Sequence, residues 1–335
     1  MGPSAGGQLA APSPDQVVEV LRQALSAQPE LERVFIAAFN DTQHPLNLRT
    51  ALLHPQRSSV CLNEIGEIAA MRPIDDADFR GVVVRTANID SVLFKLEVPG
   101  LSTADNASRF DDEFRKKHPI IASMGDAPSV EELLQLDAYA HQLRVGVMRQ
   151  LRNQLSQIAG KVAEDGFPLV NTRAKDGTGI VDKIGRMRQG SPEKPPRPNY
   201  SLSDMPDALG GRITVTMTAD SPHELAGLAT RFEKVFAGDI LERDSFYANP
   251  IKRERPYRVV TYTLGIGGMR AEVQLTTLSA SIAADLAHNT LHKPLIPLNM
   301  GESEQIMLFW RKATARELEV LARRAPEHRD GENLT

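Results

Sequence analysis

Residues 257–277 read YRVVTYTLGIGGMRAEVQLTT, and this stretch determines the fold class that the sequence predicts. Its two halves, Tyr257 to Leu264 and Met269 to Thr276, are rich in the β-branched and aromatic residues that are typical of strands. The link between them, Gly265-Ile266-Gly267-Gly268, favours a tight turn. We therefore expect an antiparallel hairpin here.

Strands and helices alternate on both sides of this hairpin. Further strands are predicted at Arg212 to Met217 and Asp239 to Glu242, and helices at Ser129 to Ile158, after Ser221 (N-cap) and Pro222, at Ser279 to Leu291 and at Glu302 to Arg324. The sequence thus predicts an α+β fold over residues 126–300, a mixed β-sheet flanked by helices. Residues 301–335 are expected to add a C-terminal helix, in the core or at an oligomer contact, and a frayed tail.

Residues 1–125 are predicted to form a separate, small α+β domain of unknown role. Apolar residues between Pro14 and Phe39 recur at helical spacing, and Pro29 divides them into two helices. The runs Val82 to Val84 and Val92 to Val98, separated by the turn-prone Asn88-Ile89-Asp90, predict strands. The polar stretch Leu101 to Pro128 is interpreted as a linker or a surface excursion, which sets the expected boundary near residue 125.

The composition is typical of a soluble globular protein. The 335 residues are 41% hydrophobic and 24% charged with a net charge of -4, which gives no overall indication of nucleic-acid binding. The single cysteine, Cys61, excludes an intramolecular disulfide and a cysteine-rich zinc site. No signal peptide and no apolar run of about 20 residues is found, so we expect a cytoplasmic protein without a membrane partner.

Basic residues gather around a glycine-containing turn. Arg173 and Lys175 alternate on an extended segment, so their side chains point the same way. If a helix begins near Gly179, Lys183 and Arg186 share one of its faces. Four cations and a helix N-terminus are suited to a polyphosphate, although a solvated basic loop has the same pattern.

Acidic residues accompany two of the predicted strands. Asp207 precedes Gly210-Gly211-Arg212 at a strand entrance, where an acid can bind magnesium or simply cap a turn. Glu272 and Gln274 stand on the same side of the last strand of the hairpin. That strand either contributes polar groups to a site or has one solvated face.

Together these elements resemble the synthetase domain of RelA/SpoT alarmone enzymes. That family has Arg-x-Lys, then a serine, then Lys and Arg, followed by Asp-x-x-Gly-x-Arg and Glu-x-Gln-x-Arg-Thr. The matching positions here are Arg173, Lys175, Lys183, Arg186, Asp207, Gly210, Arg212, Glu272, Gln274 and Thr277. Tyr257-Arg258 stands in place of the family's Gly-Tyr-Arg-Ser-x-His, and His288 with Lys293 resembles its closing His and Lys. The resemblance covers about Ser129 to Pro294.

The resemblance implies an ATP-dependent pyrophosphokinase that transfers the β,γ-pyrophosphate of ATP to a ribose 3′-hydroxyl of a guanine or adenine nucleotide. By this analogy Asp207 and Glu272 bind Mg²⁺, and Glu272 also takes the proton of the hydroxyl. The residues implied for ATP are Arg173, Lys175, Lys183, Arg186 and Arg212, and those implied for the acceptor are Tyr257, Arg258, Gln274, His288 and Lys293.

Four departures from the family pattern leave alternatives open. The family serine is Gly179, its glycine before tyrosine is Pro256, its histidine falls on Thr261, and its last arginine is Thr276. One alternative is a toxin that pyrophosphorylates the 3′ end of tRNA, with Lys252, Arg253, Arg255 and Arg258 near the RNA phosphates. Another is a non-catalytic, nucleotide-sensing module.

The role of the N-terminal region is a separate hypothesis. Long family members carry a hydrolase domain with an adjacent His-Asp pair, but this sequence has no His-Asp dipeptide, and His44, His54 and His118 are scattered. We therefore expect no hydrolase. Residues 1–125 are instead candidates for an inhibitory or sensing segment, or for a surface that recruits an antitoxin or regulatory partner.

Overall fold

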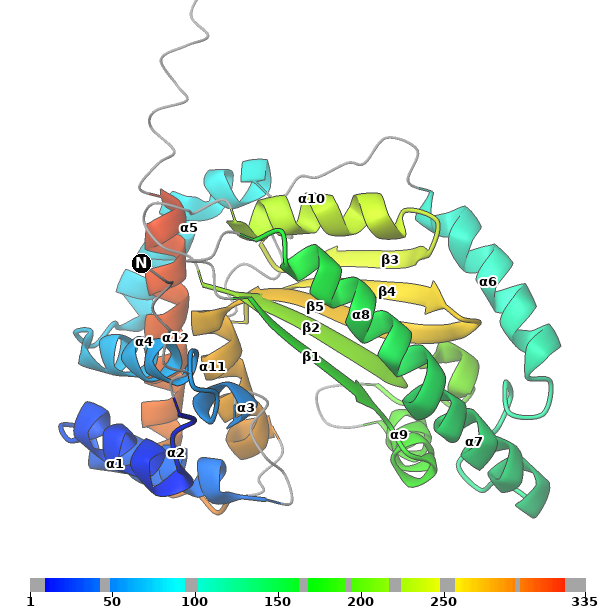
Figure 1. The fold of residues 1–335 in the computed structure, drawn as a ribbon, viewed down its shortest axis with the longest axis horizontal. Helices are drawn as coiled ribbons and strands as arrows, with labels where there is room; N and C mark the ends of the chain where they lie inside the picture. Colours follow the sequence, from blue (N-terminus) through cyan, green and yellow to red (C-terminus); the bar gives the residue numbers. More distant parts are fainter. Residues whose placement is uncertain are drawn as a thin grey trace, which may run out of the picture.

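A mixed five-stranded sheet lies at the centre of the fold (Figure 1). The computed structural model describes residues 10–42, 49–93, 102–162, 168–190, 195–216, 224–247, 257–292 and 296–322. The strands are β1 Leu169–Ala174, β2 Leu209–Val215, β3 Ile240–Ser245, β4 Val260–Ile266 and β5 Met269–Thr277, in the order β1-β2-β5-β4-β3. Strands β2 and β5 are parallel, and the other neighbours are antiparallel. The predicted α+β class with a mixed sheet is confirmed.

The predicted hairpin joins β4 to β5 through a two-residue turn. Ile266 pairs with Met269, and the turn residues Gly267 and Gly268 have φ angles of 59° and 71°. Two positive φ angles define the turn type whose twist matches that of antiparallel strands, and glycine adopts them without strain. This local signal therefore sets the register of the two central strands.

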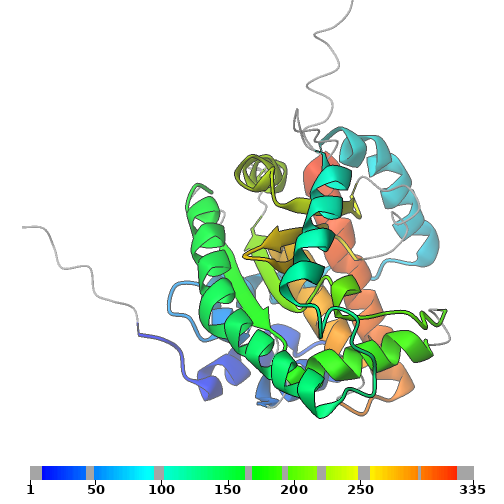
Figure 2. The same cartoon turned by 90° about the vertical axis from the view of Figure 1, so that its right-hand side faces the viewer.

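One face of the sheet is covered by helices from two parts of the chain: one pair precedes β1, and a further helix lies between β2 and β3. Helix α7 (Val130–Gln142) begins at the predicted capping box, in which Ser129 and Glu132 bond each other's backbone N–H groups. It continues through a π-helical turn, Leu143–Val147, into α8 (Met148–Ala159), and this rod runs along one side of the sheet in Figure 2. Helix α10 (Glu224–Phe236) packs on the same face, and the predicted cap at Ser221 and Pro222 lies outside the described residues.

The described part of residues 1–125 is helical, so the strand predicted at Val82 to Val84 is wrong. Its helices are α1 Pro14–Leu25, α2 Pro29–Asn40, α3 Arg49–Leu52, α4 Ser58–Ala70, α5 Asp76–Leu93 and α6 Thr103–Lys117. Helix α5 contains the valine run because Phe79, Val82, Val83 and Thr86 are buried at helical spacing, while Val84 is 73% exposed. Residues 94–98 of the second predicted strand lie outside the described residues.

The predicted linker between residues 101 and 128 is also wrong, because α6 occupies its first half. Phe110 and Phe114, four residues apart, are buried and stack on each other with ring centroids 5.9 Å apart. One apolar stripe is enough to dock an otherwise charged helix. Helix α6 packs against β3 at the far edge of the sheet.

The helices that follow the sheet pack against the N-terminal helices. They are α11 (Leu278–Ala287), a π-helical turn at His288–His292 and α12 (Met300–Ala322). Buried residues of α1, α2 and α4 form one apolar cluster with those of α11 and α12, and the rings of Phe35 and Phe309 meet at 5.3 Å. The boundaries predicted near residues 125 and 300 stay predictions. No described helix is both long and apolar enough to cross a membrane.

Candidate active site

The second face of the sheet carries the polar residues that the sequence singled out. Side chains alternate between the two faces of a strand, so Gly211 faces α8 while Gly210 and Arg212 face the other way. Arg173, Gly210 and Glu272 pair across β1, β2 and β5, and Asn171, Arg212 and Gln274 form the adjacent row. These six residues, with Thr172 and Gly211, line an open cleft of about 430 Å³.

Gly210 creates the space in which the Arg173 side chain crosses the sheet. A Cβ atom at Gly210 would lie 3.2 Å from both Cγ and Nε of Arg173. The missing side chain therefore lets Arg173 extend over β2 toward Glu272 on β5. The glycine of the Asp-x-x-Gly-x-Arg pattern is therefore explained by sterics, because any side chain at Gly210 would crowd Arg173.

Asp207 is held by two ammonium groups at the entrance of β2. The Nζ atom of Lys183 on α9 (Gly177–Gln189) donates to its carboxylate, and Nζ of Lys175 lies 3.3 Å from Oδ2. Burial raises the pKa of the Asp207 carboxyl, whereas the two lysines lower it. The combined effect of the lysines is larger, so the pKa of Asp207 lies below its usual value. Burial lowers the pKa of the Lys175 ammonium below its ordinary value, although Asp207 opposes the shift. The three residues form one mostly buried, charged cluster.

Glu272 has the opposite electrostatic behaviour. Burial raises the pKa of its carboxyl, and the nearby charge of Asp207 raises it further. Lys183, Arg173 and a hydrogen bond from Gln274 lower the pKa, but they do not compensate fully. Since Asp207 and Lys183 both act on Glu272, the two acids share one electrostatic environment. A carboxylate with a raised pKa is a better proton acceptor than an ordinary one.

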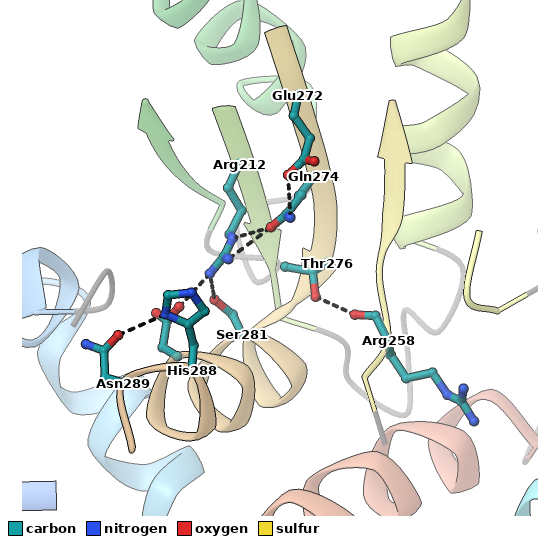
Figure 3. A network of polar contacts seen from close by, with 9 residues as sticks. Arg212, Arg258, Glu272, Gln274, Thr276, Ser281, His288 and Asn289 are labelled. Atoms are coloured by element: carbon teal, nitrogen blue, oxygen red, sulfur yellow. Dashed lines mark hydrogen bonds and ion pairs between the residues drawn. The ribbon is translucent and has the colours of Figure 1, made fainter. Parts of the chain in front are cut away.

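Arg212 is bound entirely within the protein (Figure 3). Its Nε and Nη2 donate to Oε1 of Gln274 at 3.1 and 2.9 Å, and its Nη1 donates to Ser281 at 3.2 Å and to Asp285 at 2.8 Å. The guanidinium thus lies in a hydrogen-bond network between β5 and α11, while Arg212 also lines the cleft. The ATP-binding role that the resemblance implied for Arg212 stays a prediction.

Arg173 and Arg186 differ from the other implied ATP ligands in their surroundings. Neither side chain has a hydrogen bond or ion pair with the residues that the structure describes, and Arg173 is exposed. The N-terminus of α9 is partly satisfied, because the Asp176 carboxylate accepts the N–H of Gly179 at 2.7 Å. The backbone N–H of Gly179, at the position of the family serine, is therefore already bonded to a carboxylate.

Of the implied acceptor residues that the structure describes, Tyr257 and Gln274 lie near Arg212, whereas the Arg258 side chain extends away from Gln274. Tyr257 meets the ring of Phe246 edge-on at 4.9 Å, and burial raises the pKa of its hydroxyl while Arg212 opposes the shift. The Arg258 side chain is buried and its Nη1 donates to the carbonyl of Phe246, so it extends away from Gln274 (Figure 3). His288 is exposed and bonds Asn289 through Nδ1 at 3.0 Å. Lys293 and residues 252–256 lie outside the described residues.

The substituted positions have identifiable neighbours. Thr261 pairs with Gln274 across β4 and β5 and therefore faces the cleft side of the sheet. Thr276 Oγ1 donates to the backbone carbonyl of Arg258 at 3.0 Å. A short hydroxyl at each position leaves room where the family has a long basic or aromatic side chain.

Sequence reasoning missed Asn171, Thr172, Ser281 and Asp285. Asn171 alternates with Arg173 on β1, so the period-2 pattern contained a signal for it. Asp285 is the only charged residue in the otherwise small and apolar segment LSASIAADLA of α11, and its side chain is only 3% exposed. A lone acid in such a helix indicates a specific partner, but the pattern does not say which one.

The two acids suit magnesium better than a transition metal. Among the described residues, no group of three or more His, Cys, Asp and Glu side chains could hold a metal ion. Magnesium is commonly bound by one or two carboxylates together with waters and substrate phosphates, so a complete protein cage is not needed. Asp207 and Glu272, with their mutual electrostatic influence, fit that donor set.

Comparison with known proteins gives matches to solved structures only. No protein-family model matches the chain, and no curated protein matches it. Small alarmone synthetase 1 of Bacillus subtilis, bound to its product pppGpp, is 19% identical with a TM-score of 0.39, covering 55% of this chain and 94% of its own. A GTP pyrophosphokinase family protein of Streptococcus pneumoniae is 19% identical with a TM-score of 0.36, covering 60% and 94%. Small alarmone synthetase 2 of B. subtilis is 17% identical with a TM-score of 0.34, covering 57% and 93%.

Proposed function

We propose that this chain is an ATP-dependent pyrophosphokinase that transfers the β,γ-pyrophosphate of ATP to the ribose 3′-hydroxyl of a guanine or adenine nucleotide. The observation that carries the proposal is a pair of acids near one end of β2 and β5: Glu272 lines the cleft, and Asp207, two residues before β2, acts on the pKa of Glu272. Asp207 has a lowered pKa beside two lysines, and Glu272 has a raised pKa beside the exposed Arg173. Acids whose environments separate their pKa values take different roles in acid–base chemistry.

The reaction needs alignment and charge neutralisation more than covalent help. The acceptor 3′-oxygen attacks the β-phosphorus of ATP, the bond from that phosphorus to the α,β-bridging oxygen breaks, and AMP leaves. Glu272 takes the proton of the 3′-hydroxyl. Its raised pKa supports this role, and its hydrogen bond from Gln274 at 3.0 Å holds one oxygen in place.

The cations bind the phosphates from two sides. Arg173 reaches over Gly210 from β1, and Lys183 and Arg186 share a face of α9. Lys175 contacts Asp207, and its backbone N–H donates to Ala208 at 2.9 Å, which anchors it beside β2. Mg²⁺ bound at Asp207 and Glu272 would neutralise charge on the transferred group.

A nucleotide-binding module without catalysis is the second candidate, and the lysines at Asp207 favour it. Both ammonium groups contact the carboxylate that would bind a metal. A site of this kind can bind a polyphosphate with no divalent ion. Calorimetry of ATP binding with and without MgCl₂ separates the candidates, because affinity that is independent of magnesium supports the module.

The direct test uses ATP labelled at the β- or the γ-phosphate in parallel reactions. Each is incubated with GDP, GTP, ATP or bulk tRNA, and thin-layer chromatography follows the label and AMP. Pyrophosphate transfer moves both labels into one product and releases an equal amount of AMP. Glu272→Gln should abolish this transfer, whereas Glu304→Gln, at an exposed position on α12, should leave it unchanged. Transfer of the γ-label alone, or full activity of Glu272→Gln, would contradict the proposal.

A further inference from the structure

A chain of hydrogen bonds connects a buried acid on α11 to the candidate base on β5 (Figure 3). Asp285 accepts from Nη1 of Arg212 at 2.8 Å, and Nε and Nη2 of Arg212 both donate to Oε1 of Gln274. Nε2 of Gln274 then donates to Oε1 of Glu272 at 3.0 Å. Four side chains from three elements are thus joined in a fixed order.

The order of donors and acceptors gives this chain a direction. A guanidinium only donates and a carboxylate only accepts, whereas a primary amide has one end of each kind. Because Arg212 donates twice to the amide oxygen of Gln274, the amide nitrogen must face Glu272. Without Arg212, the Gln274 amide can rotate and present its oxygen to the Glu272 carboxylate, which is repulsive.

Asp285 determines how Arg212 is oriented. The Asp285 side chain is 3% exposed and that of Arg212 18% exposed, so the pair is largely shielded from water. A charge-assisted bond in such surroundings is stronger than a neutral one. Ser281 also accepts from Nη1 of Arg212 at 3.2 Å, but it offers no charge.

We propose that Asp285 is a positioning residue for the reaction, acting on Glu272 through Arg212 and Gln274. The inference rests on the proposed function, since it assigns a role to Glu272 as the base. It also gives α11 a part in catalysis.

The Asp285→Asn variant tests this series of hydrogen bonds, which we call the relay. The charged and titratable groups that act on Glu272 are Asp207, Lys183, Arg173, Arg212 and Tyr257, and this substitution replaces none of them. Loss of the charged partner should let Arg212 and then Gln274 reorient, so that the Glu272 carboxylate is no longer held in position. We expect kcat to fall about 10- to 100-fold with KM for ATP changed less than about threefold, because misorientation affects the chemical step.

Three further variants show whether the effect passes through the relay. Asp112→Asn, the same substitution at an exposed position on α6, should keep kcat within about threefold of wild type. Asp285→Glu should recover part of the loss. Arg212→Lys keeps the charge but removes the planar fork, so it should lower kcat with little change in KM for ATP, as Asp285→Asn does. A kcat within about threefold of wild type in folded Asp285→Asn, or in Arg212→Lys if the former does not fold, would overturn the proposal.

A spectroscopic measurement separates this inference from the proposed function. In the full-length protein labelled with ¹⁵N-glutamine, the side-chain amide of Gln274 should show slowed hydrogen exchange that Asp285→Asn accelerates at least tenfold. If the wild type transfers no pyrophosphate but this change is seen, the proposed function fails and the relay stands. If the protein is active and the exchange is unchanged, the relay fails alone.

Discussion

Replacing Gly210 and Gly211 by alanine, one at a time, tests which face of β2 carries the site. The glycines are adjacent, and neither has a positive φ, so alanine itself is compatible with both backbones. A methyl group at Gly210 would press on the stem of Arg173, with contacts at 3.2 Å. A methyl group at Gly211 would enter the core at 2.7 Å from Leu155 and 3.4 Å from Val273. The same atom is therefore added on opposite sides of one strand.

The magnitudes follow from what each methyl group displaces. Arg173 is exposed and flexible, so Gly210→Ala should leave stability unchanged or raise it by about 0.4–1 kcal/mol through the unfolded state. Displacing its guanidinium removes one charged contact with phosphate, about 1.5–3 kcal/mol, which is roughly a 10- to 100-fold loss in kcat/KM for ATP. Gly211→Ala overpacks the core at a cost of about 1–3 kcal/mol.

Thermal unfolding and steady-state transfer assays on both variants give the comparison. Gly210→Ala should lose activity at a wild-type melting temperature, and Gly211→Ala should lose melting temperature while its folded fraction retains activity. The reverse pattern would refute the assignment of the site to this face. Arg173→Ala should be no worse when combined with Gly210→Ala, because both changes remove the same contact.

Three further predictions concern charge. Glu272→Gln should raise the melting temperature at pH 7–8, because a pKa raised by folding favours the native state only at low pH; calorimetry should show the gain disappearing below about pH 4.3. Asp207→Asn should cost about 1–3 kcal/mol at pH 7 in urea unfolding, and this cost should vanish as the pH falls through the lowered pKa of Asp207; a constant difference contradicts it. Glu64→Gln removes one of the two α4 carboxylates, Glu64 and Glu67, that pair with Arg316 on α12, so hydrogen exchange should accelerate in α4 by at least about threefold. Glu19→Gln at an exposed ion pair should change nothing.

The parts of the fold that the sequence predicted are those determined by neighbouring residues. The turn at Gly267-Gly268 and the capping box at Ser129 depend on contacts three residues apart or fewer. The valine run of α5 was misassigned because β-propensity was weighed above the spacing of Phe79, Val82 and Val83. A buried helix can tolerate β-branched residues when their spacing places them on one packed face.

In the candidate site, too, the features set by nearby residues were predictable and those set by tertiary packing were not. The alternation of Glu272 with Gln274 placed both on one face of β5, as the period of a strand requires. The bonds of Arg212 were not predictable, because Asp285 is 73 residues away and meets it only after α11 has folded back on the sheet. Arg258 carried a basic signal next to Tyr257, but its burial depends on the packing of β3 and β4.

The apolar cluster that joins the first and last helices has a consequence for synthesis on the ribosome. Leu21, Phe35 and Phe39 emerge early, yet Phe309 and Ile306, which belong to the same cluster, follow some 270 residues later. At about 5–20 residues per second, this interval is roughly 15–50 s. During that time the apolar side chains of the amino-terminal helices are exposed, because α11 and α12 have not yet been made. A nascent chain arrested before α11 should therefore bind chaperones more than the completed chain does.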